Sequence, residues 1–294
     1  MKTIKYVFAA VLTLLAIGCS EEETSDNTQD YAPVKVHVND FSVSIDQFTT
    51  RAATDVANYT DVGAITLAFY NGTTEVYKHT QLRSDNTTFS TFGEFSCNLP
   101  LGNYTMVVIG RGYFDGDEFS LTSPTSAGYT SERVRETFSA TQAVNITSTD
   151  AVELSATLNR VIAQLLIRST DARIDGVSKI RTTYAAGGKS FSPSTGLATS
   201  NTGFAVTNTP SAAVGTTIGV GSFLFLASDQ QSVNVTIEVL DEDNQVMFTK
   251  SVPNVPMQRN KQTTLTGPVF TTTAPTTSSF KIEADWLEGT TVPF

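Results

Sequence analysis

The sequence is poor in the residues that usually build metal centres and active sites. Its 294 residues include only two cysteines and two histidines. Two cysteines cannot form the multiple crosslinks of a disulfide-rich domain or the cysteine sets of structural zinc sites. His37 and His79 occupy polar positions of alternating segments, where a lone histidine is typical of a surface group. The sequence therefore predicts no enzyme, no catalytic residue, no metal site and no cofactor.

A long hydrophobic run is also missing. The main apolar stretch, Tyr6–Ile17, covers about a dozen residues, whereas a membrane-spanning helix needs about 20. Lys2 and Lys5 precede it, a pattern typical of a secretory signal. The stretch ends in Ala-Ile-Gly followed by Cys19 instead of the usual Ala-x-Ala cleavage site. A soluble secreted protein with an incidental cysteine is one interpretation.

The segment "LAIGCSEEE", residues 15–23, supports another interpretation because it resembles the lipobox of bacterial lipoproteins. The resemblance implies that residues 1–18 form a signal peptide that is removed, and that Cys19 is lipidated. Stable membrane attachment needs two signals, so the three acyl chains of such a lipoprotein would form a durable anchor. Residues 19–33 contain almost no apolar side chain and are predicted to be a disordered tether.

Positive charge is scarce as well. Without residues 1–18 the chain keeps 17 basic against 29 acidic residues, a formal net charge of −12. Such a chain repels nucleic acid and anionic lipid headgroups, so neither is predicted to bind it through charge. With Cys19 lipidated, Cys97 in "FSCNL" has no disulfide partner within the chain. Its alternating surroundings favour a small core residue over a reactive thiol.

What the sequence contains in quantity is alternation of apolar and polar residues. Charged residues make up only 16%, and abundant Thr, Ser and Val favour strands over helices. From Val34, "VKVHVNDFSVSI" predicts two strands or one bent strand, and "RVIAQLLIRS" predicts a central strand. Hairpins are predicted about Asn71-Gly72 and about Asp241–Asn244. Only "SERVRETFSA", residues 131–140, could form a short helical turn.

The predicted fold is all-β, with two β-sandwich domains in tandem. Strands of this length with turns every eight to twelve residues are typical of sandwiches. The 276 residues left after signal removal are too many for one such sandwich and suit two. We place the N-terminal domain at residues 34–157 and the C-terminal domain at 158–294. The junction lies where "VELSATL" is followed by "NRVIAQLLIRS".

Two further features allow more than one interpretation. The acidic clusters at residues 115–118 and 241–244 could bind calcium weakly, but they lack the spacing of a calcium loop and are more typical of turns. Several aromatic residues could form a platform that stacks on sugars, although scattered aromatics more often belong to cores or edges. These residues are Tyr31, Tyr59, Tyr113, Tyr129 and Trp286.

Several segments, taken in order, resemble the fimbrillins and FimB-type fimbrial subunits of Bacteroidales. "CSEEE" is similar to the tag that sends lipoproteins of these bacteria to the outer face of the outer membrane. The other segments are "FTTRAAT" at 48–54, "LPLGNYTMVV" at 99–108, "LSATLNRVIAQLLI" at 154–167 and "VPMQRNKQTTLTGPVF" at 255–270, together with the terminal "ADW". The resemblance implies two tandem transthyretin-like β-sandwich domains and a role in type V pili.

The resemblance also implies a maturation site. In stalk subunits of that family an arginine-specific protease removes the lipidated first strand, and a strand of the next subunit takes its place. Here the scissile residue would be Arg51 and the new N-terminus Ala52, with "VKVHVNDFSVSIDQF" as the removable region. The alternative is a surface arginine after the first strands. The tail after Trp286 is short for a donor segment, which favours an anchor, tip or accessory adhesin.

The sequence thus predicts a lipid-anchored outer-membrane protein that faces the cell exterior. Its expected partners are other fimbrial subunits, the outer membrane through lipidated Cys19, and surface ligands of host or bacterial cells. It would act by protein–protein contact, including donor-strand exchange. The alternative function is a surface glycan-binding lipoprotein, which requires several aromatic residues on one exposed face.

Overall fold

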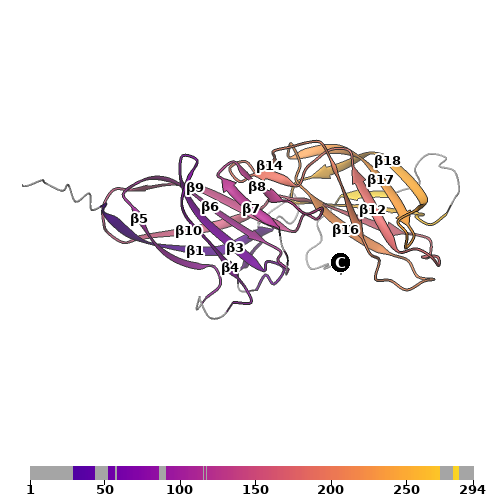
Figure 1. The fold of residues 1–294 in the computed structure, drawn as a ribbon, viewed down its shortest axis with the longest axis horizontal. Coiled ribbons are helices and arrows are strands. Elements are labelled where there is room, and N and C mark those ends of the chain that lie inside the picture. The colour runs from indigo at the N-terminus through magenta and orange to yellow at the C-terminus, as the bar shows by residue number, and fades with distance from the viewer. Residues whose placement is uncertain are drawn as a thin grey trace, which may run out of the picture.

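A computed structural model describes residues 29–43, 52–56, 58–85, 91–114, 116, 118–271 and 281–284. Every regular element within these ranges is a β-strand, which confirms the predicted all-β class. The molecule is elongated, with the first half of the chain at one end, the second half at the other, and β7, β8 and β14 between them (Figure 1). No helix among these residues has the length and apolar character needed to cross a membrane.

The described residues of the first half form ten strands. They are β1 Tyr31–Val43, β2 Ala52–Asp55, β3 Ala64–Asn71, β4 Thr74–Leu82, β5 Glu94–Pro100, β6 Gly102–Arg111, β7 Phe119–Ser123, β8 Ser126–Tyr129, β9 Thr137–Ile146 and β10 Val152–Arg160. Eight of them form one sheet in the order β2-β1-β10-β9-β6-β3-β4, with β5 also paired to β1. This sheet folds over a single core, in which β3, β6 and β9 share buried side chains with β1, β5 and β10. The result is a β-sandwich.

Another ten strands occur in the part of the second half that the structure describes. They are β11 Ala163–Ser169, β12 Lys179–Tyr184, β13 Ser190–Ser192, β14 Leu197–Ala198, β15 Phe204–Asn208, β16 Gly219–Leu224, β17 Gln230–Leu240, β18 Val246–Gln258, β19 Gln262–Gly267 and β20 Lys281–Ala284. Two four-stranded sheets, β16-β11-β19-β20 and β15-β12-β17-β18, enclose a second core. Along β17, buried valine and isoleucine side chains alternate with more exposed residues. They are buried because their face of the strand is the one that meets the other sheet.

A third core joins the halves. Strands β8 and β13 pair with each other, so the sheet β14-β13-β8-β7 takes two strands from each half. Beneath it, the rings of Phe191 and Phe225 stack with centroids 4.4 Å apart, and Tyr70, Ile109 and Tyr129 of the first half join the same cluster. A glycine is required at position 128, since a Cβ there would stand 2.6 Å from Cα of Ser190. The two halves are therefore fastened by both main-chain pairing and aromatic packing.

The principal hairpins follow the sequence predictions. The turn at Asn71-Gly72 connects β3 and β4, and residues 241–245, which include the predicted turn at 241–244, connect β17 and β18. The segment "RVIAQLLIRS" contributes β11, which lies between two strands as expected of a central strand. The bent-strand interpretation of the first alternating segment is confirmed, because β1 is one strand with an irregularity between Val38 and Asp40.

Other expectations need correction. The helical turn predicted at residues 131–140 is wrong: Val134 makes a bridge to Phe223, and β9 begins at Thr137. The charged residues of this segment are held by tertiary contacts, such as Arg133 donating to the Asn208 side chain at 2.9 Å. Local helix preference yields to these contacts.

Two strands extend across the predicted limits of the tether and of the N-terminal domain. β1 already begins at Tyr31, inside the segment predicted to be a tether. β10 continues through residue 157, and the chain passes to the second half at residues 161–162. The three residues Tyr31–Pro33 are too few for their alternation to distinguish a strand from a tether. Their pairing with β5 in the structure identifies them as part of a strand.

Candidate functional site

The first strand lies within the sandwich rather than beside it. β1 pairs in parallel with β10 along one edge. Along its other edge it pairs with β5 near its start and with β2 near its end. Its buried side chains are at most 3% exposed and belong to the first core: Ala32, Val34, Val36, Val38 and Phe41. Removing β1 would therefore leave an open slot with main-chain groups on both walls and apolar side chains at its floor.

The two predicted maturation residues relate to this strand in different ways. Ala52 is the first residue of β2, and its backbone pairs with Val43 at the end of β1. Arg51 and the lipidation candidate Cys19 lie outside the described residues. The sequence from 44 to 51 thus connects the end of β1 to the strand that would begin a cleaved chain.

At the junction of the halves, a buried polar network holds the end of β10. Arg160 forms an ion pair with Glu136 at 2.6 Å, with side chains 1% and 11% exposed. Arg160 also donates to the Tyr59 hydroxyl at 2.7 Å, and that hydroxyl donates to Glu136 at 2.8 Å. A further hydrogen bond of 3.2 Å joins Arg160 to Oδ1 of Asn260 in the second half. One arginine therefore connects the end of β10 with two loops of the first half and with the second half of the molecule.

Burial dominates the ionisation of this network. It raises the pKa of Glu136 despite the opposing attraction of Arg160 and the hydrogen bond from Tyr59. Burial, with the Glu136 charge nearby, also raises the pKa of the Tyr59 hydroxyl far above its ordinary value. Both groups thus favour their uncharged forms more than they would in water.

This shift predicts a pH dependence. A carboxyl group whose folded pKa is raised keeps its proton at pH values where the unfolded chain has lost it, so its contribution to stability falls as pH rises above the ordinary value of 4.5. The free energy of unfolding of the wild-type protein should therefore decrease relative to Glu136→Gln as pH rises from 4.5 towards neutrality. Urea titrations of both proteins at several pH values measure this difference. An increase instead would show that Arg160 outweighs burial.

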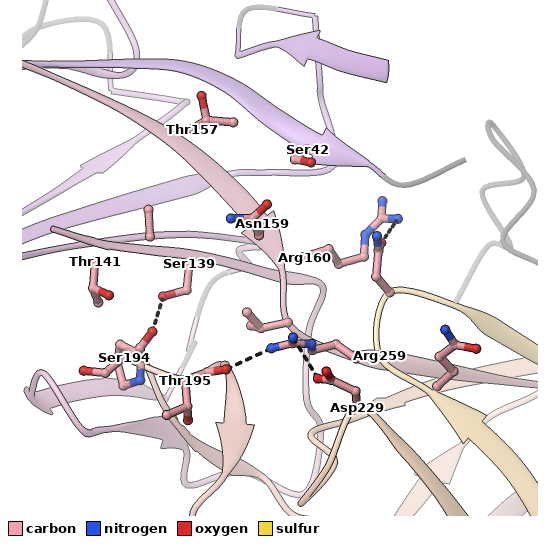
Figure 2. Close-up of a pocket in the computed structure, with 16 residues that line it drawn as sticks. Ser42, Ser139, Thr141, Thr157, Asn159, Arg160, Ser194, Thr195, Asp229 and Arg259 are labelled. Carbon is pink, nitrogen blue, oxygen red and sulfur yellow. Dashed lines mark hydrogen bonds and ion pairs between the residues drawn. The ribbon is translucent and has the colours of Figure 1, made fainter. Parts of the chain in front are cut away.

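Next to the network lies a polar cleft of about 650 Å³ between the halves. Figure 2 shows Ser42, Thr157 and Asn159 at one side, Ser139 and Thr141 at another, and Ser194 and Thr195 facing them from the second half. Six hydroxyl side chains and three amides line it, and none of its lining residues is aromatic. The cleft can offer many hydrogen bonds but no ring for stacking.

The second half contributes a charged group to the wall of the cleft. Arg259 pairs with Asp229 at 2.8 Å and donates to the Thr195 carbonyl oxygen at 2.9 Å (Figure 2). Gly196 permits this approach, because a Cβ there would lie 2.6 Å from Nη1 of Arg259. Since each of the two lining arginines has a carboxylate partner, the wall is close to neutral.

Comparison with known proteins places the chain in a family. The profile of a family of unknown function, DUF6562, matches residues 31–289, from the first residue of β1 to beyond β20. The chain belongs to DUF6562. No curated protein sequence matches it.

Solved structures resemble this DUF6562 chain to different degrees. A "putative adhesin" from Bacteroides ovatus ATCC 8483 has a TM-score of 0.50 and 11% identity, over 81% of this chain and 88% of that chain. The fimbrial anchor protein Mfa2 from Porphyromonas gingivalis has a TM-score of 0.48 and 12% identity, over 88% of this chain and 98% of that chain. At such identities the likeness concerns the fold.

The remaining candidates are dispersed over the DUF6562 structure. His37 contacts Glu94 on an exposed face, and no group of three or more potential metal ligands occurs among the described residues. Asp241 caps the β17–β18 turn by accepting from the Gln245 backbone at 2.8 Å. Cys97 is half-buried against the first core, and burial raises the pKa of its thiol to about 11. A raised pKa disfavours the reactive thiolate.

The tyrosines do not form an aromatic platform. Tyr129 is 4% exposed inside the third core, and Tyr59 points into the buried network. Tyr31 is exposed at the start of β1, whereas Tyr113 lies after β6. Trp286 and the acidic positions 115 and 117 are outside the described residues.

The network and the cleft were missed by sequence reasoning. Arg160 stands immediately before a dense apolar run, and a charge in that position is a signal that it needs a partner. The sequence around Arg160 could not have identified its partners, because Tyr59, Glu136 and Asn260 come from three other parts of the chain. The cleft likewise combines lining residues from both halves.

Proposed function

We propose that this DUF6562 chain is an outer-membrane lipoprotein, held through acylated Cys19 and facing the cell exterior. It acts as a fimbrial subunit of the anchor, tip or accessory-adhesin kind. Its role is structural rather than catalytic, and its partners are other fimbrial subunits together with surface ligands of host or bacterial cells. Membership of the FimB-type group and transthyretin-like domains are part of the same proposal.

The observation that carries the proposal is the position of β1. A strand bonded on both edges, with five buried apolar side chains, occupies the place that a donated strand would take. Burial of each larger apolar side chain contributes about 1.5–3 kcal/mol, so an empty slot would bind a replacement strongly. The cleft is polar and both of its arginines are paired with carboxylates, which supports a role in contact rather than chemistry.

The position of β2 determines what cleavage after Arg51 would leave. Among the described residues it pairs with the end of β1 alone, so loss of β1 would also remove the partner of the new N-terminal strand. Residues beyond β2 would stay attached, because Arg83 donates to the carbonyl oxygens of Val56, Tyr59 and Val62 at 2.7–2.9 Å. A cleaved chain would keep its remaining structure around the slot. An uncleaved chain would keep its lipid and serve as an anchor.

Lipidation has a direct test. Cys19→Ala should release the protein from the membrane fraction of the native host, because the other cysteine is half-buried and cannot replace it. Cys97→Ala is the matched control and should remain in the membrane fraction. Protease treatment of whole cells then tests display at the surface. Membrane retention of Cys19→Ala would refute the anchor, and full protection from protease would refute exposure.

Mass spectrometry of the native N-terminus separates the two forms of the proposal. A lipidated Cys19 would identify an anchor or accessory subunit, whereas a terminus at Ala52 would identify a processed subunit. In the second case Arg51→Ala should abolish the shorter form. Arg168→Ala, which changes an exposed arginine on β11, should leave processing unchanged. A third terminus would contradict both assignments.

A further inference from the structure

Strands β9 and β10 follow each other in the chain but pair at only one end. Their ladder consists of Ser139 with Asn159 and Phe138 with Arg160. Over residues 140–146, β9 pairs only with β6, and over residues 152–158, β10 pairs only with β1, as far as the described residues extend. Each strand therefore has one open main-chain edge along this length. We call the gap between these two edges the seam.

The first core is incompletely covered at the seam. Ala140, Val152 and Leu154 pack against this core but stay partly exposed. The neighbouring Val144 and Ala156 are buried in the same core. The seam thus combines an apolar strip with unfilled main-chain positions, the two features that a strand needs for docking.

The usual protection of an open edge is missing here. Proteins guard such edges with lysine, proline or a bulge. Residues 139–159 contain no lysine, arginine or proline, and the irregularity in the β1–β10 pairing lies on β1, between Val38 and Asp40, rather than on β9 or β10. The only charged side chains in this stretch are Asp150 and Glu153. An edge of this composition favours pairing and prefers a partner with positive charge.

The seam also leads into the polar cleft. The cleft is lined by residues 139–141 of β9 and by Thr157, Asn159 and Arg160 of β10, at the point where the two strands part. Its hydroxyl and amide groups face this point from both halves (Figure 2). They could hydrogen-bond the polar end of a chain that runs along the seam.

We propose that the seam is a docking site for one extended strand of a partner protein. The strand would alternate apolar residues, which cover Ala140, Val152 and Leu154, with lysine or hydroxyl residues, which face Asp150 and Glu153. Added to the open edge of β9 or of β10, one strand would extend that sheet by one strand spacing of about 4.8 Å. The site is separate from the β1 slot and requires neither lipidation nor cleavage after Arg51.

A synthetic peptide tests the proposal on the purified protein with β1 in place. The probe is a ten-residue peptide in which valine alternates with threonine and lysine. Its control has the same side chains but every second amide N-methylated, which removes donors without changing charge. The unmodified peptide should bind at least about tenfold more tightly, a difference of ~1.4 kcal/mol. Equal binding of both peptides, or binding of neither, would overturn the proposal.

Hydrogen exchange and two variants locate the binding. Peptide addition should slow exchange of amides within 140–146 or 152–158 and leave those of the β4 edge unchanged. Ala143→Lys with Ser155→Lys, both exposed positions, should weaken binding at least about tenfold. Ser120→Lys, at an exposed position of β7, adds a lysine away from the seam and should have no effect. Protection of every seam amide before peptide addition, or equal weakening by Ser120→Lys, would refute the assignment.

Discussion

Replacement of Arg160 by alanine should lower the free energy of unfolding by about 3–5 kcal/mol, the usual cost of breaking a buried ion pair by removing one partner. The side chain of Arg160 is 1% exposed, and its removal leaves Glu136, 11% exposed, without its counter-ion. The Tyr59 hydroxyl and the Asn260 amide oxygen each lose a hydrogen-bond donor as well. Urea unfolding at neutral pH measures the loss.

A surface ion pair provides the control for this prediction. Arg181 pairs with Glu238 at 2.7 Å, but its side chain is 35% exposed. Arg181→Ala should therefore cost no more than about 1 kcal/mol. Combining Arg160→Met with Glu136→Leu and Tyr59→Phe removes the polar groups together and should recover most of the lost stability. Similar losses for Arg160→Ala and Arg181→Ala would mean that burial does not set the strength of the network.

Replacement of Phe191 by alanine should cost about 3–5 kcal/mol, as expected for loss of a fully buried phenylalanine. It should also uncouple the halves, because its ring stacks on Phe225 in the core that they share. Differential scanning calorimetry should then show two transitions in place of one. Gly128→Val should have the same effect by a different route, since its Cβ would collide with Ser190 and break the β8–β13 pairing.

The matched control for this second prediction is Phe69→Ala. Phe69 is also fully buried but belongs to the first core alone. Its replacement should cause a comparable loss of stability while leaving the third core intact. Two transitions in Phe69→Ala, or a single transition in both Phe191→Ala and Gly128→Val, would contradict a coupling role for the third core.

Local patterns in the sequence were sufficient for the strands and hairpins. Alternation from Val34 indicates strand β1, and Asn71-Gly72 indicates the β3–β4 turn, because each depends on residues close together in the chain. The segment at 131–140 shows the limit of that reasoning. Its helical spacing is overruled by the Val134–Phe223 bridge, whose two residues are far apart in sequence.

The sequence by itself determined the all-β class, the acidic charge and the scarcity of metal-binding and nucleophilic residues, because these depend on composition and short-range spacing. It also supplied the hypotheses about Cys19 and Arg51, which lie outside the described residues. Only the tertiary structure decided that β1 pairs with β10 and that β8 pairs with β13. The same holds for the contact between Arg160, Glu136 and Tyr59. Strand register and buried charge pairs join residues that are far apart in the sequence, from 24 positions for Arg160 and Glu136 to 118 for Val34 and Val152. They become visible only when packing has selected one arrangement.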